Sequence, residues 1–131
     1  MPQNTPHVML SARDKAVLVA GWLLEKKARE VLALDVADIN PICEAMVVAS
    51  AANVRQAKAL ADHVLERCAE EGISYLGMEG YRLGQWVLLD LNDVTVHIFQ
   101  EEVRPFYNLE GLWSEGKPIP LPETVVETSR V

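Results

Sequence analysis

The stretch that decides the fold is EGYRLGQWVLLDLNDVTVHIF, residues 79–99. Its two halves, residues 86–91 and 94–99, are rich in β-branched, aromatic and aliphatic side chains, which are typical of strands. Asn92 and Asp93 stand between them, and both residue types tolerate the positive φ that a two-residue hairpin turn needs. The stretch therefore predicts a loop, a strand, a tight turn and a second strand.

The two faces of the first predicted strand differ in character, because successive side chains point to opposite sides of a strand. Val87, Leu89 and Leu91 share one face, which is entirely apolar and is expected to lie on the core. The other face begins with Trp86 and ends with Asp90. That face is expected to lie against a second layer of the protein or against a partner.

Two helices are predicted upstream of the hairpin. Ser11 is typical of a helix N-cap, and apolar residues recur at helical spacing after it, which predicts a helix from residue 12 to residue 25 or 27. Asn53 is expected to cap a second helix over residues 53–71, which Gly72 ends. Both segments therefore present an apolar stripe that can pack on a sheet.

Three further strands are expected over residues 31–36, 45–50 and 73–78, and a helical segment around residues 105–112. This element order predicts an α/β fold of the mixed α+β kind, with a mixed five-strand sheet and helices packed on it. The crossover through the second helix is expected to join two parallel strands.

The chain has 131 residues, of which 50% are hydrophobic and 24% charged, as in an ordinary globular domain. Its 19 acidic and 12 basic residues leave a net charge of −7. That balance argues against a protein that grips nucleic-acid phosphates over a broad face, so we expect no direct sequence-specific nucleic-acid binding. It favours a partner with a basic surface.

Cysteine and apolar patterns bear on the cellular setting. Cys43 and Cys68 have no metal-ligand spacing, and His7, His63 and His97 share none either. No run of 18 apolar residues exists, so no membrane span is expected. A cytoplasmic protein without a metal or cofactor is the simplest interpretation.

The two ends of the chain differ from its middle. Residues 1–11 contain two prolines and no periodicity, and we expect them to form a flexible arm. Residues 114–131 contain three prolines and no apolar stripe, and we expect a flexible tail. The folded domain is thus predicted over residues 12–113.

The hairpin also carries a family resemblance. Glu-Gly-Tyr, a short spacer, Trp-Val-Leu-Leu-Asp and Asp-Val-Thr-Val-His-Ile-Phe continue into EVRPFYNLEGLW, residues 102–113. This ordered series is similar to that of the ribosomal silencing factors of the Iojap family, and the resemblance covers residues 12–113. It implies a translational repressor that binds the large ribosomal subunit, through ribosomal protein number fourteen, and blocks joining with the small subunit.

The resemblance further implies a nucleotidyltransferase-like topology, which raises the alternative of a small nucleotide-binding or nucleotidyl-transfer domain. That chemistry needs a Gly-Ser turn near the phosphates and paired carboxylates for magnesium. The chain has Ser50-Ala51-Ala52 at the turn, and Asp62 stands without a second carboxylate about a dozen residues on. We therefore expect no catalytic, metal-binding or cofactor-binding residue, and no enzyme activity.

A partner-binding surface is predicted around the hairpin, because an aromatic side chain ringed by carboxylates is typical of an interface hot spot. The predicted residues are Glu79, Tyr81, Trp86, Asp90, Glu101, Glu102 and Tyr107. The alternative for the two aromatic residues Tyr81 and Trp86 is that they pack under the helices.

Trp22 and His97 leave further alternatives. Trp22 widens the apolar stripe of the first helix, so it either thickens a core contact or touches a second subunit. The second option would make the chain a homodimeric scaffold, which is a third class of function. His97 alternates with Val96 and Ile98, so it faces away from their apolar side, and a hydrogen-bonded structural role is expected.

Overall fold

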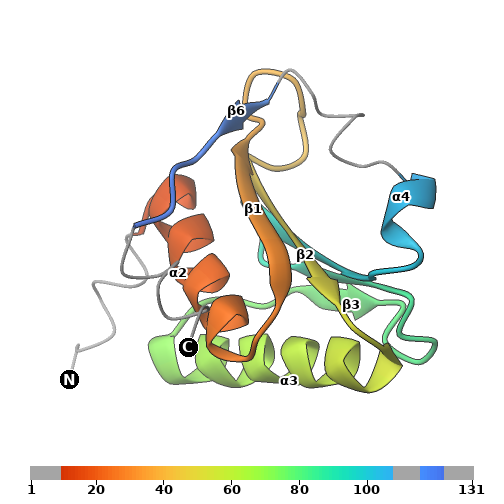
Figure 1. The fold of residues 1–131 in the computed structure, drawn as a ribbon. Helices are drawn as coiled ribbons and strands as arrows, with labels where there is room; N and C mark the ends of the chain where they lie inside the picture. Colours follow the sequence, from red (N-terminus) through yellow and green to blue (C-terminus); the bar gives the residue numbers. More distant parts are fainter. Residues whose placement is uncertain (1–9, 108–115, 123–131) are drawn as a thin grey trace.

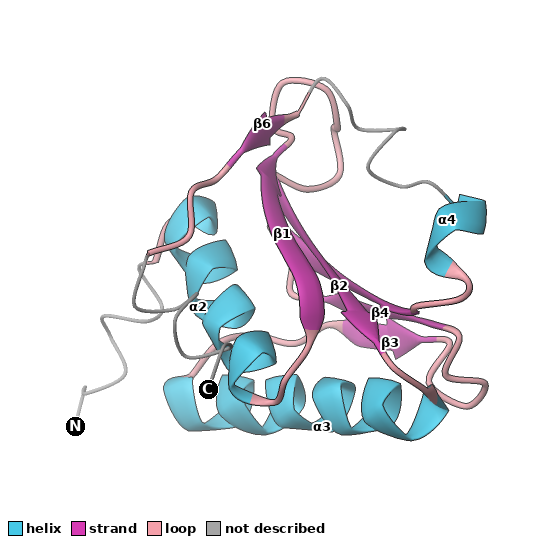
Figure 2. Cartoon of the chain, in the orientation of Figure 1, coloured by secondary structure: helices cyan, strands magenta, loops and turns pink. Residues whose placement is uncertain are grey.

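The structure, a computed structural model, describes residues 10–107 and 116–122. Its elements are α2 (Ala12–Glu25), β1 (Arg29–Asp35), β2 (Ala45–Ala51), α3 (Val54–Glu71), β3 (Gly77–Glu79), β4 (Trp86–Asp90), β5 (Val94–Gln100), α4 (Arg104–Tyr107) and β6 (Lys117–Pro118). The strands form one curved sheet, and α2 and α3 cover the same side of it (Figure 1). The short α4 lies on the opposite side of the sheet from these two helices (Figure 2).

The sheet has the strand order β3-β4-β5-β2-β1-β6. β2 pairs with β5 in parallel, and every other neighbouring pair is antiparallel. Because two antiparallel steps separate β3 from β5, β3 runs in the same direction as β2, as expected for the crossover through α3. The mixed α/β class is confirmed, whereas the nucleotidyltransferase-like topology stays a prediction.

The expected count of five strands is wrong, because a sixth strand comes from the segment expected to be a flexible tail. Lys117 and Pro118 of β6 pair with β1 at the edge of the sheet, where a proline is tolerated since one of its sides needs no hydrogen bond. Ile119 then donates its N–H to the Ala33 carbonyl at 2.8 Å and is only 4% exposed. The remainder of that segment, and the arm over residues 1–9, lie outside the described residues.

Both long helices begin at the predicted caps. Ser11 Oγ accepts from the Asp14 N–H at 3.0 Å, and Asn53 Oδ1 accepts from the Gln56 N–H at 2.8 Å. Gly72 ends α3 with a φ of 73°. α2 ends at Glu25, the earlier of the two expected ends, because Lys27 adopts a left-handed φ of 68° that a helix cannot continue through.

The main core lies between the two helices and the sheet face that they cover. Trp22 is 2% exposed and belongs to this core, with the Arg67 guanidinium 5.5 Å from the centroid of its ring. A contact between Trp22 and a second subunit is therefore wrong, because the side chain is already buried within its own chain. The thick core contact is confirmed.

The hairpin of β4 and β5 has the predicted turn. Asn92 has a φ of 80°, and its N–H donates to Asp90 Oδ1 at 2.9 Å. Val87, Leu89 and Leu91 are fully buried on the helix side. By contrast, the strand expected over residues 73–78 is present only as β3, Gly77–Glu79, which begins four residues later and shares two residues with the expected range.

The helical segment expected around residues 105–112 is represented by α4, and its later part lies outside the described residues. Within the described ranges, no helix is long and apolar enough to cross a membrane.

The packing of Ile119 generates a stability prediction. Ile119→Ala should lower the free energy of unfolding by about 2–3 kcal/mol, because it removes buried apolar surface and leaves a cavity. Ile42→Ala is the matched control, since Ile42 is 81% exposed and should change stability by less than about 0.5 kcal/mol. Chemical denaturation of both variants measures this, and equal stabilities would show that β6 is not part of the folded unit.

Candidate partner-binding face

The face of the sheet that points away from α2 and α3 is here named the second face. In the hairpin it consists of Trp86, Leu88, Asp90, Thr95, His97 and Phe99. Trp86 lies directly opposite Phe99, and His97 lies diagonal to Trp86. β2 continues this face with Met46 and Val48, which form a second, smaller apolar cluster with Phe99.

Trp86 is half-buried on the second face, and two of its contacts within the described residues are with Phe99 and His97. Its ring stacks on Phe99, with centroids 5.0 Å apart and planes 26° apart. Its Nε1–H donates to His97 Nδ1 at 3.1 Å. Trp86 therefore does not pack under the helices, and part of its ring remains accessible to a partner.

His97 is 7% exposed and has a hydrogen bond at each ring nitrogen. Because Nδ1 accepts from Trp86, the ring proton resides on Nε2, which lies 3.1 Å from Thr95 Oγ1 and donates to it. Burial lowers the pKa of His97 to about 4, so the ring is neutral near pH 7. The expected hydrogen-bonded structural histidine is confirmed.

The two cysteines are buried and do not form a reactive site with His97. Cys43 Sγ lies 3.7 Å from Thr95 Oγ1, and burial raises the pKa of its thiol. Burial also raises the pKa of Cys68, to about 11. Both thiols are therefore protonated near pH 7 and are poor nucleophiles.

Tyr81 lies apart from the second face and is partly buried against the main core, as the alternative interpretation expected, and its role in partner binding stays a prediction. Its hydroxyl donates to Asp62 of α3 at 3.0 Å, which raises the pKa of Tyr81, and its ring lies 5.5 Å from Lys58 Nζ. Gly80, with a φ of 81°, turns the chain toward α3 so tightly that a Cβ there would collide with the Trp86 carbonyl oxygen.

The carboxylates of the predicted surface lie around the hairpin without forming one ring. Asp90 is at its turn end, and Glu101 and Glu102 follow β5 at the end that carries Trp86. Glu101 is paired with Arg29 at 2.6 Å, whereas Glu102 is exposed. Glu79 is exposed at the end of β3.

Tyr107 ends α4, and its side chain lies outside the described part of the chain. Thr95, His97 and Phe99 were not among the predicted partner-binding residues. Strand alternation alone would have assigned all three to the face of Trp86. The hydrogen bond from Trp86 to His97, however, depends on the pairing register.

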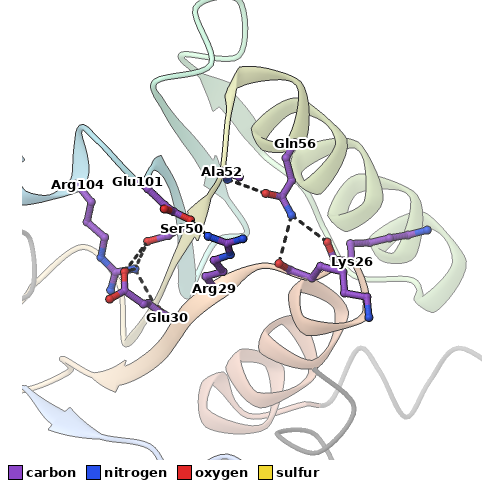
Figure 3. A network of polar contacts seen from close by, with 9 residues as sticks. Lys26, Arg29, Glu30, Ser50, Ala52, Gln56, Glu101 and Arg104 are labelled. Atoms are coloured by element: carbon purple, nitrogen blue, oxygen red, sulfur yellow. Dashed lines mark hydrogen bonds and ion pairs between the residues drawn. The ribbon is translucent and has the colours of Figure 1, made fainter. Parts of the chain in front are cut away.

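The Ser50 turn, where phosphate would bind in a nucleotidyl-transfer domain, is occupied by the protein's own side chains (Figure 3). The buried Ser50 Oγ accepts from Arg104 Nη1 at 2.6 Å and donates to Glu30 Oε1 at 3.2 Å. The Ala52 N–H donates to Gln56 Oε1 at 2.6 Å. The Ser50 hydroxyl and the Ala52 N–H are thus already bonded within the protein.

A pocket of about 640 Å³ opens beside this turn, with Lys27, Arg29 and Gln56 in its lining. The Gln56 amide in this lining donates to the Lys26 and Lys27 carbonyls at 3.2 Å each. Across residues 10–107 and 116–122, no three His, Cys, Asp or Glu side chains are grouped to hold a metal ion.

The buried His97 generates a prediction about pH. An unfolded histidine titrates near 6.5 and folded His97 near 4, so the unfolded state binds more protons between these values. The low pKa of folded His97 therefore contributes to the free energy of unfolding, and this contribution is fully present above pH 6.5 and is lost as the pH falls toward 4. Wild type should therefore lose about 2 kcal/mol more stability than His97→Asn between pH 7 and pH 4.5.

Urea denaturation at the two pH values measures this difference. The carboxylates titrate in both proteins, so their effect on stability cancels when the two losses are compared. An equal loss of stability in wild type and His97→Asn would contradict the buried, neutral state of the ring.

Comparison with known proteins identifies relatives of the whole domain. The family model described as "Ribosomal silencing factor during starvation" matches residues 9–130. A ribosomal silencing factor of Chromobacterium violaceum is 38% identical over 92 residues, which cover 70% of this chain and 75% of the relative. Another ribosomal silencing factor, from Halalkalibacterium halodurans, is 36% identical over 112 residues, which cover 86% of this chain and 96% of the relative.

A crystal structure of a protein from Chromobacterium violaceum has a TM-score of 0.73 and 34% identity, covering 80% of this chain and 88% of that one. A chloroplast protein of Zea mays named Iojap also matches, at 31% identity over 107 residues, or 82% of this chain and 46% of that protein. These matches confirm the resemblance recognised in the hairpin. The chain belongs to the family of ribosomal silencing factors.

Proposed function

We propose that this chain binds the large ribosomal subunit through ribosomal protein number fourteen and prevents the small subunit from joining. Translation would then be damped when nutrients are short. Membership of a family described by ribosomal silencing during starvation carries this proposal. The mechanism is steric exclusion, so it requires a docking surface and no chemical step, and we infer that the chain is not an enzyme and acts in the cytoplasm.

The second face is our candidate for the docking surface. Its half-buried Trp86 is a large aromatic side chain in a fixed orientation, which is the kind of residue that dominates interface energetics. Asp90, Glu101 and Glu102 lie near the ends of the hairpin and suit the rim of an interface with a basic protein. The net charge of −7 favours the same kind of partner.

A nucleotide-binding domain is the second candidate, and the pocket beside the Ser50 turn is the observation in its favour. Against it, the Ser50 hydroxyl and the Ala52 N–H are bonded within the protein. Asp62 accepts from Tyr81 on the surface of α3, away from this turn. Titration with ATP and magnesium separates the candidates, and we expect no binding in the millimolar range.

The docking surface generates a prediction for Trp86→Ala. Truncating a tryptophan at an interface centre costs about 2 kcal/mol or more, so the affinity for purified large subunits should fall roughly thirty-fold. Leu83→Ala is the control, because Leu83 is 69% exposed in the loop that packs on α3 and should bind like wild type. Co-sedimentation measures binding, and circular dichroism confirms that each variant is folded.

A subunit-joining assay with the same proteins tests the inhibitory step. Wild type and Leu83→Ala should block joining, and Trp86→Ala should not at the same concentration. If wild type did not impede joining, the proposed function would fail. If folded Trp86→Ala blocked joining as well as wild type, the second face would not be the docking surface.

The acidic rim generates a prediction about salt. Glu102→Lys should slow association with large subunits, and the defect should be largest at low ionic strength, where rim charges are least screened. Glu66→Lys makes the same charge change on the exposed side of α3 and is the matched control. Association rates measured between about 50 and 300 mM salt test this, because the Debye length falls over that range from roughly 14 to 6 Å. Equal defects in both variants would mean that only net charge matters.

A further inference from the structure

We infer that His97 is a positioning residue for partner binding, which fixes through its Nδ1 atom the orientation in which the Trp86 indole meets the partner. This inference rests on the proposed function and adds a residue and a contact to it. His97 itself is 7% exposed, so it acts through Trp86 rather than by touching the partner across a broad surface.

Two contacts among the described residues bear on the orientation of the indole. Stacking on Phe99 fixes the plane of the ring, with centroids 5.0 Å apart. Stacking alone would allow the ring to turn over, because both faces of an indole are apolar. The hydrogen bond from Trp86 Nε1 to His97 Nδ1, at 3.1 Å, is directional and selects one of these orientations.

His97 can serve as this acceptor because its own ring is held in place. Its Nε2–H donates to Thr95 Oγ1 at 3.1 Å, and its ring is nearly parallel to that of Phe99, with planes 11° apart and centroids 6.4 Å apart. Burial keeps the ring neutral near pH 7, since it lowers the pKa of His97 to about 4, and only a neutral ring can accept a hydrogen bond at Nδ1.

The hydrogen bond to His97 also limits which chemical groups of a partner can bind to Trp86. The indole N–H is already donated to His97, so the accessible part of the half-buried indole offers a partner apolar surface and no hydrogen-bond donor. A partner group that fits is an aliphatic side chain or a lysine or arginine cation. Such a cation agrees with the basic partner that the acidic chain favours.

The test uses the full chain with His97→Asn, which retains an acceptor oxygen near the position of Nδ1, and His97→Leu, which has similar bulk and no acceptor. Nitrogen-15 NMR of the free protein reports the indole N–H of Trp86, assigned by its loss in Trp86→Phe. Exchange of this proton with water should be slow in wild type and His97→Asn, and faster in His97→Leu.

Binding to purified large subunits is then measured for all variants in a double-mutant cycle. His97→Leu should bind roughly five-fold more weakly than wild type, as expected for one hydrogen bond, whereas His97→Asn should bind within about two-fold of it. In the Trp86→Phe background, which has no indole N–H, His97→Leu should cause no further loss.

Three results would overturn the inference. Wild-type affinity in His97→Leu would show that orientation of the indole does not matter. An equal loss in the Trp86→Phe background would show that His97 acts on the fold in general. Failure of wild type itself to bind would remove the proposed function and this role with it, and the NMR result would still identify the contact in the free protein.

Thr95→Val is a second variant that tests the inference if His97→Leu does not fold. It keeps His97 and removes the acceptor of its Nε2–H, so it should weaken binding in the same direction with little change in volume. Unchanged affinity and unchanged indole exchange in folded Thr95→Val, together with an unfolded His97→Leu, would also count against the inference.

Discussion

The parallel pairing of β2 with β5 is the constraint on which the rest of this structure depends. Seven consecutive positions pair, from Ala45 with Val94 to Ala51 with Gln100. This pairing places β5 in the middle of the sheet, between β2 and β4. Because side chains alternate along β5, the register decides which of them meet the helices and which form the second face. A slip of one residue would exchange the two sets.

The two faces of the sheet have different roles in this account. The helix side is packed with fully buried aliphatic residues and Trp22, and it supplies most of the apolar burial that stabilises the domain. On the second face, Trp86 is stacked and hydrogen-bonded and remains half-buried. Holding an aromatic ring in place before binding reduces the entropy that binding would otherwise cost. A pre-ordered Trp86 therefore suits the docking role that we propose for the second face.

Much of the fold follows from local patterns in the sequence. The caps at Ser11 and Asn53 and the turn at Asn92 depend on neighbouring residues, so they were predictable. Strand β6 was not, because its prolines are typical of a loop and its anchor Ile119 is a single apolar side chain without a periodic pattern. Trp22 was ambiguous, since a wide apolar stripe does not reveal what covers it.

The candidate site was less predictable than the fold for the same reason. The alternation of β4 correctly assigned Trp86 and Asp90 to one face. The separation of Tyr81 from that face was not predictable, because the reversal at Gly80 is a backbone feature that carries the next residue to α3. The contact between Trp86 and His97 joins residues on different strands, so it requires the register and not just the sequence.

The central claim is that the second face docks on the large subunit, and electron cryo-microscopy of large subunits saturated with this chain tests it most directly. The account predicts that the chain occupies the surface that meets the small subunit, with Trp86 in contact with ribosomal protein number fourteen and α2 and α3 turned toward solvent. A complex in which α2 or α3 faces the ribosome, or in which the joining surface stays open, would contradict it.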